Sequence, residues 1–386
     1  MSAYDEPFDD DEPAEGEWDE RIEEAVLSDS DELDLSGYGH DTLPDSLADL
    51  THLTELDLSD NNLAALPEWL GNFTFLTALH LSGNVFTTLP EPLRHLPALT
   101  ELHLSGNHLT ALPEWTGELT SLTHFDLRNN ALGELPASLG RLSSLGTLDL
   151  SSNGLTAPPE SLGDLTALTE LHLSGNHLTG LPASPSGLGA LTHLDLDHNR
   201  LTRLPEWIGR LTGLTTLLLG SNHLTALPES LGNLRALTWL NLDSNDLTAL
   251  PAPLGGLTAL TGLNLGGNRL GARPGSLPDS LRGLTALTHL DLNGNGLTTL
   301  PETLGELTAL TGLVLRGNRL TTLPASLGRL KALTGLHLDH NAFTELPACV
   351  RDLTALTRLY LGGNDIDALP AWPADRETLV VFRDDV

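Results

Sequence analysis

The stretch LTELHLSGNHLT occupies residues 99–110 and recurs, letter for letter, at residues 168–179. The start points 99 and 168 differ by 69 residues, which is three times 23. Aligned at 23 residues, the chain follows the template L-x-x-L-x-L-x-x-N-x-L-x-x-L-P-x-x-L-G-x-L-x-x, as in residues 53–75. The Asn recurs from Asn61 to Asn364, with one longer step of 27 residues after Asn268. With a degenerate first copy near Ser30, this predicts an array of about fifteen stacked repeats.

Each part of the repeat predicts a local structure. In L-x-L the leucines alternate with polar residues, which is the period of a half-buried strand. Leu56 and Leu58 should therefore point inward, and Asp57 outward. The Asn that follows should hydrogen-bond between neighbouring turns, because a buried amide without partners costs about 1–3 kcal/mol. Leu-Pro predicts an extended corner, and the short return through Leu-Gly predicts brief helical or 3₁₀ turns.

These motifs resemble the leucine-rich repeat family, in particular its 23-residue, Leu-Pro-containing type. Similar repeats occur in Ras-suppressor-like proteins and in bacterial Roco-related proteins, and the resemblance covers residues 31–370. It implies an α/β solenoid of horseshoe shape, with a parallel β-sheet on the concave face and short helical or 3₁₀ turns on the convex face. It also implies a bacterial protein whose concave face binds other proteins. No basic stretch followed by an apolar stretch opens the sequence, so we expect the protein to be cytoplasmic.

The ends of the chain differ from the repeats. Residues 1–16 are acidic and lack periodicity, so we expect a disordered tail. Residues 17–44 resemble the segment with a short capping helix that opens many bacterial members. The helix is expected over residues 17–30, where Trp18, Ile22 and Val26, spaced by four, should cover the first repeat. Residues 371–386, with Leu379 and Val381 alternating against their neighbours, should cap the other end. One solenoid domain, residues 31–370, is expected between them, because a single repeat cannot bury enough surface to fold alone.

Composition narrows the possible partners. The chain holds 19 basic and 52 acidic residues, a net charge of −33. Nucleic acid and anionic membranes are disfavoured because both require clustered Lys and Arg, and no run of apolar residues is long enough to span a bilayer. We therefore expect a monomer whose protein partner has a basic contact surface. The single Cys349 excludes an internal disulfide.

Outward positions on the predicted strands are the candidate contact residues, because equivalent positions form rows across a sheet. The N-terminal part of this surface is acidic with interleaved His, and the C-terminal part is rich in Gly. Trp239, Leu218 and Tyr360 are candidate anchors, although Trp239 could instead only pack over Gly262. The predicted partner-binding residues are Asp57, His80, His103, His124, Asp126, Asp149, His172, His193, Asp195, Leu218, Trp239, Asn241, Asp291, Arg316, His337 and Tyr360.

The His and Asp rows leave two other functions open. Imidazoles on neighbouring strands, such as His80 and His103, could chelate zinc with Asp126. Duplication of the repeat, which carries His within it, explains the same pattern without a metal. Alternatively, neighbouring carboxylates could raise the pKa values of these His residues and make the surface a pH sensor. The chain could also be the substrate-recognition part of a multi-protein enzyme system.

No catalytic motif is apparent. The sequence holds no phosphate-binding loop and no nucleophile elbow, and Cys349 lies within a repeat, which favours a structural thiol over a nucleophile. The four-residue insertion around Pro274 should bulge from the edge or the convex side. We therefore predict a scaffold or adaptor without enzymatic activity, cofactor or metal.

Overall fold

The computed structural model describes residues 17–184, 187–369 and 378–383. They fall into two compact units, divided between Gly154 and Leu155. The predicted acidic tail, residues 1–16, and most of the predicted C-terminal cap, residues 371–386, lie outside the described residues. The division of the chain into tail, caps and one solenoid domain therefore stays a prediction.

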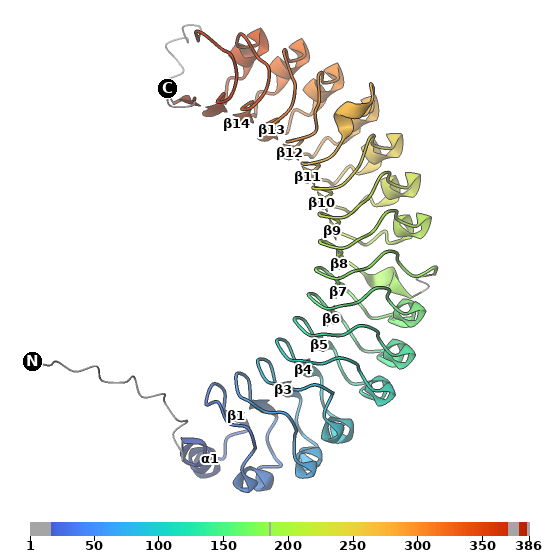
Figure 1. Ribbon diagram of the computed structural model, residues 1–386, viewed down its shortest axis with the longest axis vertical. Helices are drawn as coiled ribbons and strands as arrows, with labels where there is room; N and C mark the ends of the chain where they lie inside the picture. The colour runs from blue at the N-terminus through green and yellow to red at the C-terminus, as the bar shows by residue number, and fades with distance from the viewer. Residues whose placement is uncertain (1–16, 185–186, 370–377, 384–386) are drawn as a thin grey trace, which may run out of the picture. The chain divides into compact units, whose positions relative to one another are not determined.

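Unit 1, which ends at Gly154, begins with one α-helix and continues with six short strands and five 3₁₀ turns among its described residues (Figure 1). Neighbouring strands pair in parallel, and each residue faces the residue 23 positions further on, as Leu33 faces Leu56. The elements are α1 (Glu17–Ser28), β1 (Glu32–Asp34), η1 (Asp45–Asp49), β2 (Glu55–Asp57), η2 (Glu68–Asn72), β3 (Ala78–His80), η3 (Glu91–His95), β4 (Glu101–His103), η4 (Glu114–Glu118), β5 (His124–Asp126), η5 (Ala137–Arg141) and β6 (Thr147–Asp149).

Unit 2, which begins at Leu155, repeats this arrangement with parallel pairing from β7 to β16 (Figure 1). Its strands are β7 (Glu170–His172), β8 (His193–Asp195), β9 (Thr216–Leu218), β10 (Trp239–Asn241), β11 (Gly262–Asn264), β12 (His289–Asp291), β13 (Gly312–Val314), β14 (Gly335–His337), β15 (Arg358–Tyr360) and β16 (Val380–Phe382). Its 3₁₀ turns are η6 (Glu160–Asp164), η7 (Leu188–Ala190), η8 (Glu206–Arg210), η9 (Glu229–Asn233), η10 (Ala252–Gly256), η11 (Leu270–Ala272), η12 (Asp279–Gly283), η13 (Glu302–Glu306), η14 (Ala325–Arg329) and η15 (Ala348–Asp352).

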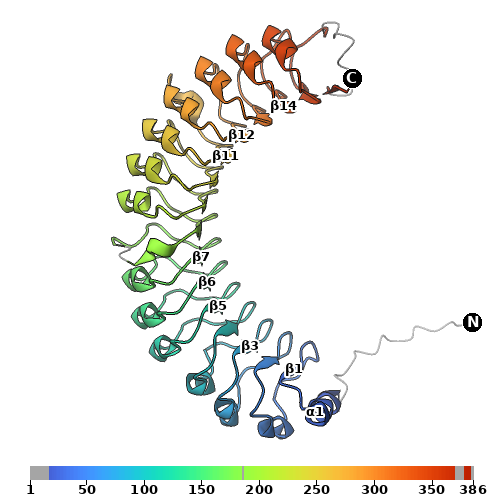
Figure 2. The ribbon, with the colours of Figure 1, turned by 180° about the vertical axis from the view of Figure 1, so that it is seen from behind.

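Within each unit the strands lie on one side and the 3₁₀ turns on the other, and Figure 2 shows the same arrangement from behind. The side chains that alternate inward from the strands are buried, as at Leu56 and Leu58, both fully inaccessible to solvent. Proline opens most turns in extended conformation; Pro67, for example, has φ −69° and ψ 150° before η2. The predicted fold class, a repeat solenoid with parallel strands and short 3₁₀ turns, is confirmed.

A ladder of buried Asn side chains connects successive repeats, as the sequence predicts. The amide oxygen of Asn84 accepts a hydrogen bond from the Leu63 N–H at 2.9 Å, and its Nδ2 donates to the carbonyls of Leu58 at 2.9 Å and Leu81 at 3.1 Å. The Leu58 carbonyl also accepts from Asn61, at 3.1 Å. Each of these carbonyls is thus held by the Asn of its own repeat and by the Asn of the next, which ties the repeats together without leaving buried polar groups unpaired.

One predicted contact of the N-terminal helix is wrong. Trp18 and Ile22 of α1 are buried at 4% and 3% exposure, as expected, but Val26 is 57% exposed. Ala25 is buried instead. Residues three and four positions apart both lie on one face of a helix, and α1 turns the residue three positions after Ile22 toward the first repeat. Val26 and its neighbour Leu27, which is 87% exposed, point away from the first repeat.

Candidate functional site

The outward-pointing side chains of the strands form what we call the strand face of each unit. The structure places Asp57, His80, His103, His124, Asp126 and Asp149 on β2–β6 in unit 1. In unit 2 it places His172, His193, Asp195, Leu218, Trp239, Asn241, Asp291, His337 and Tyr360 on β7–β15, and Arg316 two residues after β13. All of the predicted contact residues thus lie at a strand or just beyond it, while their contact with a partner stays a prediction.

The aspartates at the end of the strands also have a structural role, which the sequence reasoning missed. One carboxylate oxygen of Asp57 accepts a hydrogen bond from the backbone N–H of Ser59, at 2.8 Å. Asp149 and Asp195 do the same with the residue two positions on, at 2.9 Å and 3.0 Å. The amide oxygen of Asn264 takes this place at 3.0 Å from Gly266. The signal in the sequence is the frequent use of Asp or Asn at this position, since both can cap such a turn, although His, Leu, Val or Tyr stands there on other strands.

On unit 1, histidines and carboxylates lie close together. The rings of His80 and His103 are stacked, with centroids 4.6 Å apart and planes inclined by 12°. Glu55 lies 3.4 Å from Nε2 of His80, and Asp126 lies 3.9 Å from Nδ1 of His103. The Asp126 carboxylate raises the pKa of His103 against the opposing effect of burial. This part of the strand face combines acidic groups with an imidazole that readily takes up a proton.

The geometry gives no support to a metal centre at these histidines. Ring nitrogens donate their lone pairs in the plane of the ring, so two stacked, nearly parallel rings do not direct them to one point between the planes. Across the residues that the structure describes, no group of three His, Cys, Asp or Glu side chains is arranged to hold a metal ion.

On unit 2, the pKa values of two histidines are lower than the sequence reasoning expected. Burial, together with the nearby charge of His172, lowers the pKa of His193. Burial also lowers the pKa of His337, and this outweighs the carboxylates of Asp339 and Asp291. The expectation that neighbouring carboxylates raise the pKa of the strand-face histidines is therefore met at His103 and wrong at His193 and His337, because desolvation of the charged ring dominates there.

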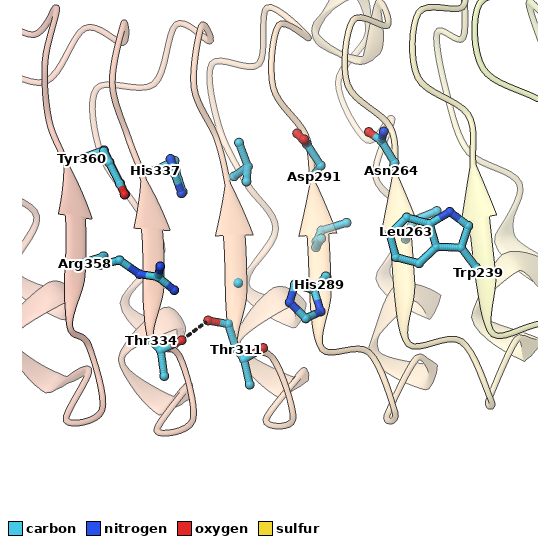
Figure 3. A pocket seen from close by; sticks show the side chains of 14 residues that line it. Trp239, Leu263, Asn264, His289, Asp291, Thr311, Thr334, His337, Arg358 and Tyr360 are labelled. Carbon is cyan, nitrogen blue, oxygen red and sulfur yellow. Dashed lines mark hydrogen bonds between the residues drawn. The ribbon is translucent and has the colours of Figure 1, made fainter. Parts of the chain in front are cut away.

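A hollow of about 500 Å³ lies on the strand face of unit 2, between Trp239 and Tyr360 (Figure 3). The indole of Trp239 is 43% exposed. At the other end, the ring of Tyr360 is stacked between those of His337 at 4.0 Å and Phe382 at 4.3 Å. The hollow forms where the glycines that the sequence places at one outward position, on β11, β13 and β14, carry no side chains.

The packing of Trp239 over Gly262 is observed, while its role as an anchor stays a prediction. A Cβ atom at Gly262 would lie only 2.1 Å from two carbons of the indole, so the ring packs directly over that glycine. The same ring keeps nearly half of its surface exposed. Trp239 is therefore packed on its neighbour while part of its side chain stays exposed to solvent.

The remaining candidate residues lie away from the strand face. Cys349 of η15 is 7% exposed, and burial raises its pKa to about 11, so the thiol is a structural group. Trp207 of η8 is 8% exposed, and its Nε1 donates to the Pro182 carbonyl at 2.8 Å, so the indole packs within the fold. The insertion forms η11 and a turn at Gly275, where φ is +73°.

Comparisons with known proteins identify the repeats. A family model described as leucine rich repeat matches residues 51–109, 97–155, 156–201, 166–224, 198–247 and 212–270. A second, described as a leucine-rich repeat region, matches residues 275–369. No curated protein matches the chain. Among its described residues, no helix has both the length and the apolar character needed to cross a membrane.

Solved structures of three proteins illustrate the similarity. A leucine-rich repeat protein of Leptospira interrogans is 32% identical, with 93% of this chain and 98% of that chain covered and a TM-score of 0.78. YopM, a leucine-rich effector protein from Yersinia pestis, is 28% identical, with 94% and 91% covered and a TM-score of 0.70. The plant peptide hormone receptor RGFR1, solved in complex with RGF2, is 29% identical, with 87% and 59% covered and a TM-score of 0.70.

Proposed function

Because this chain belongs to the leucine-rich repeat family, whose fold generally mediates protein–protein interaction, we propose that it is a non-catalytic scaffold that binds a protein partner on its strand face. The partner presents a basic contact surface. The mechanism is rigid display: the strands and their Asn ladder hold the contact side chains in place before binding, so little conformational entropy is lost on association.

The charge of the strand face of unit 1 is the observation that carries this proposal. Three positions point outward at each of β1–β6: the first residue of the strand, its last residue, and the residue two positions after its end. Over the six strands these positions together hold seven carboxylates and one cation, that of Arg128. The Arg128 guanidinium lies 3.2 Å from the Asp126 carboxylate, so its charge is largely compensated. Glu55 and Glu101 expose 47% and 46% of their side chains. Such a surface attracts a Lys- and Arg-rich protein and repels nucleic acid.

Unit 2 supplies the anchors. Trp239, Tyr360 and Leu218 point outward from β10, β15 and β9 and bring large apolar surface to a face that is otherwise polar. The plant receptor RGFR1, which has this fold, is in complex with the peptide hormone RGF2 in its solved structure, and this supports binding of a protein ligand by the present chain.

Several finer features belong to the same proposal. The repeats are of the 23-residue, Leu-Pro-containing type, similar to those of Ras-suppressor-like and bacterial Roco-related proteins, and the chain is a monomeric bacterial adaptor of the cytoplasm. Its Leptospira and Yersinia structural relatives support a bacterial origin. Residues 17–30 and 371–386 cap a solenoid that spans residues 31–370.

Charge neutralisation tests the proposal. The partner is captured with the wild-type chain, purified, and its association rate is measured at low and high salt. The variant Glu55→Gln/Glu101→Gln should associate about threefold or more slowly at low salt, with the difference shrinking at high salt. The matched control is Glu68→Gln/Glu114→Gln, because these two exposed glutamates lie on η2 and η4, on the other side of the same unit. Equal association rates for the two variants would overturn the proposal.

A further inference from the structure

Aromatic rings on the strand face of unit 2 lie over glycines of the next strand. The Trp239 indole covers Gly262, where an added Cβ would approach two ring carbons to 2.1 Å. The His289 ring leans onto Gly312, where an added Cβ would lie 3.2 Å from its Cδ2. In both pairs the glycine follows the ring by one strand in the same register. The Trp239 indole thus fills the space that a side chain at Gly262 would take, while the His289 ring borders that space at Gly312.

The next glycine in this row has no such ring. Gly335 of β14 follows Gly312 of β13 in register, and Gly312 has no side chain to place over it. A Cβ added at Gly335 would meet no atom within 4 Å. Its φ lies outside the left-handed region that favours glycine, so the backbone does not require a glycine there. Gly335, where no atom fills the space of a side chain, and Gly312, which the His289 ring borders, thus form the floor of the hollow.

The groups around this floor suit an aromatic side chain. His289 borders it on one side, and Arg358 of β15 extends toward it on the other (Figure 3). Among the described residues, the Arg358 guanidinium makes no ion pair within 4.0 Å. A guanidinium over the face of an aromatic ring is attracted by the negative π-surface. The volume, about 500 Å³, lies in the range of pockets that enclose a ligand group.

We infer that the hollow between Trp239 and Tyr360 is an anchor site for one aromatic side chain of a protein partner. The incoming ring lies over Gly335, beside His289, as the Trp239 indole lies over Gly262, and it stacks against the Arg358 guanidinium. This inference rests on the proposed function, since it names the group that the partner inserts into unit 2. It is independent of the acidic strand face of unit 1.

Selection from a displayed library of random peptides tests the inference with the full-length chain. Peptides selected on the wild type should carry Trp, Tyr or Phe, and replacement of that residue by Ala in a labelled synthetic peptide should weaken binding at least tenfold. Gly335→Phe fills the floor with the chain's own ring and should weaken binding by a similar factor. The matched control is Gly133→Phe in unit 1, another glycine with open space around its Cβ position and no positive φ.

A second variant guards against misfolding. Arg358 is exposed, so Arg358→Gln leaves the packing intact and should weaken the same peptides roughly fivefold through loss of the cation–π contact. The inference is overturned if the selected peptides lack an aromatic residue, if Gly335→Phe binds them as the wild type does, or if free aromatic amides bind as tightly as the peptides. Glu55→Gln/Glu101→Gln should not affect these peptides, so failure here and failure of the proposed function are separate outcomes.

Discussion

Replacing Asn84 by alanine tests the energetic role of the Asn ladder. Asn84 is 3% exposed and makes hydrogen bonds to three buried backbone groups. Its removal leaves the Leu63 N–H without its acceptor, which costs about 1–3 kcal/mol. The Leu58 and Leu81 carbonyls keep one donor each, from Asn61 and Asn107. Each therefore loses only a second bond, which costs about 0.5–1 kcal/mol.

These contributions predict a loss of about 2–5 kcal/mol in the free energy of unfolding for Asn84→Ala. The assay is urea denaturation of the full chain followed by circular dichroism. Asn62→Ala is the matched control, because Asn62 is exposed and makes one hydrogen bond to a neighbouring repeat, from Nδ2 to the Gly39 carbonyl at 2.8 Å. It should cost under about 1 kcal/mol. Equal losses for the two variants would refute the reasoning.

Three further outcomes follow from particular side chains. Gly262→Ala should push the Trp239 indole off the sheet and shift its emission to longer wavelength, while Gly335→Ala should not; unchanged emission would contradict the packing. Because the pKa of His103 is raised in the folded chain, protonation of His103 stabilises the fold. This contribution is complete at pH values below the pKa of His103 in the unfolded chain, and it disappears as pH rises through the pKa in the folded chain. His103→Gln should thus destabilise the chain at about pH 5.5 more than at about pH 8 in urea titrations; a pH-independent difference contradicts this. Cys349, with a pKa of about 11, should react with iodoacetamide at least roughly a hundredfold slower in the native chain than in urea, and comparable rates would exclude a buried thiol.

Features set within a single repeat could be predicted from the sequence. The alternation at Leu56 and Leu58 gives the strand, the ladder Asn has few ways to satisfy a buried amide, and Pro67 fixes the corner by its restricted φ. Since the next repeat lies 23 residues on, the row of residues on the strand face follows from the spacing alone.

Features that depend on how neighbouring side chains share space could not be predicted in this way. Helical periodicity allows either Ala25 or Val26 to face the first repeat, and only the packing of α1 decides between them. The pKa of His193 depends on burial, which the order of residues does not give. The hollow arises because the residue that faces Gly335 on the preceding strand is another glycine, Gly312, and not an aromatic residue. This relation between strands is visible only once the register is known.

Binding through the strand face is the central claim, and hydroxyl-radical footprinting of the chain, alone and with its captured partner, tests it most directly. Trp239 and Tyr360 on the strand face of unit 2 should lose oxidation in the complex. Phe75, 65% exposed between η2 and β3, should be oxidised equally in both states. Protection of Phe75 with unchanged oxidation of Trp239 and Tyr360 would contradict the account.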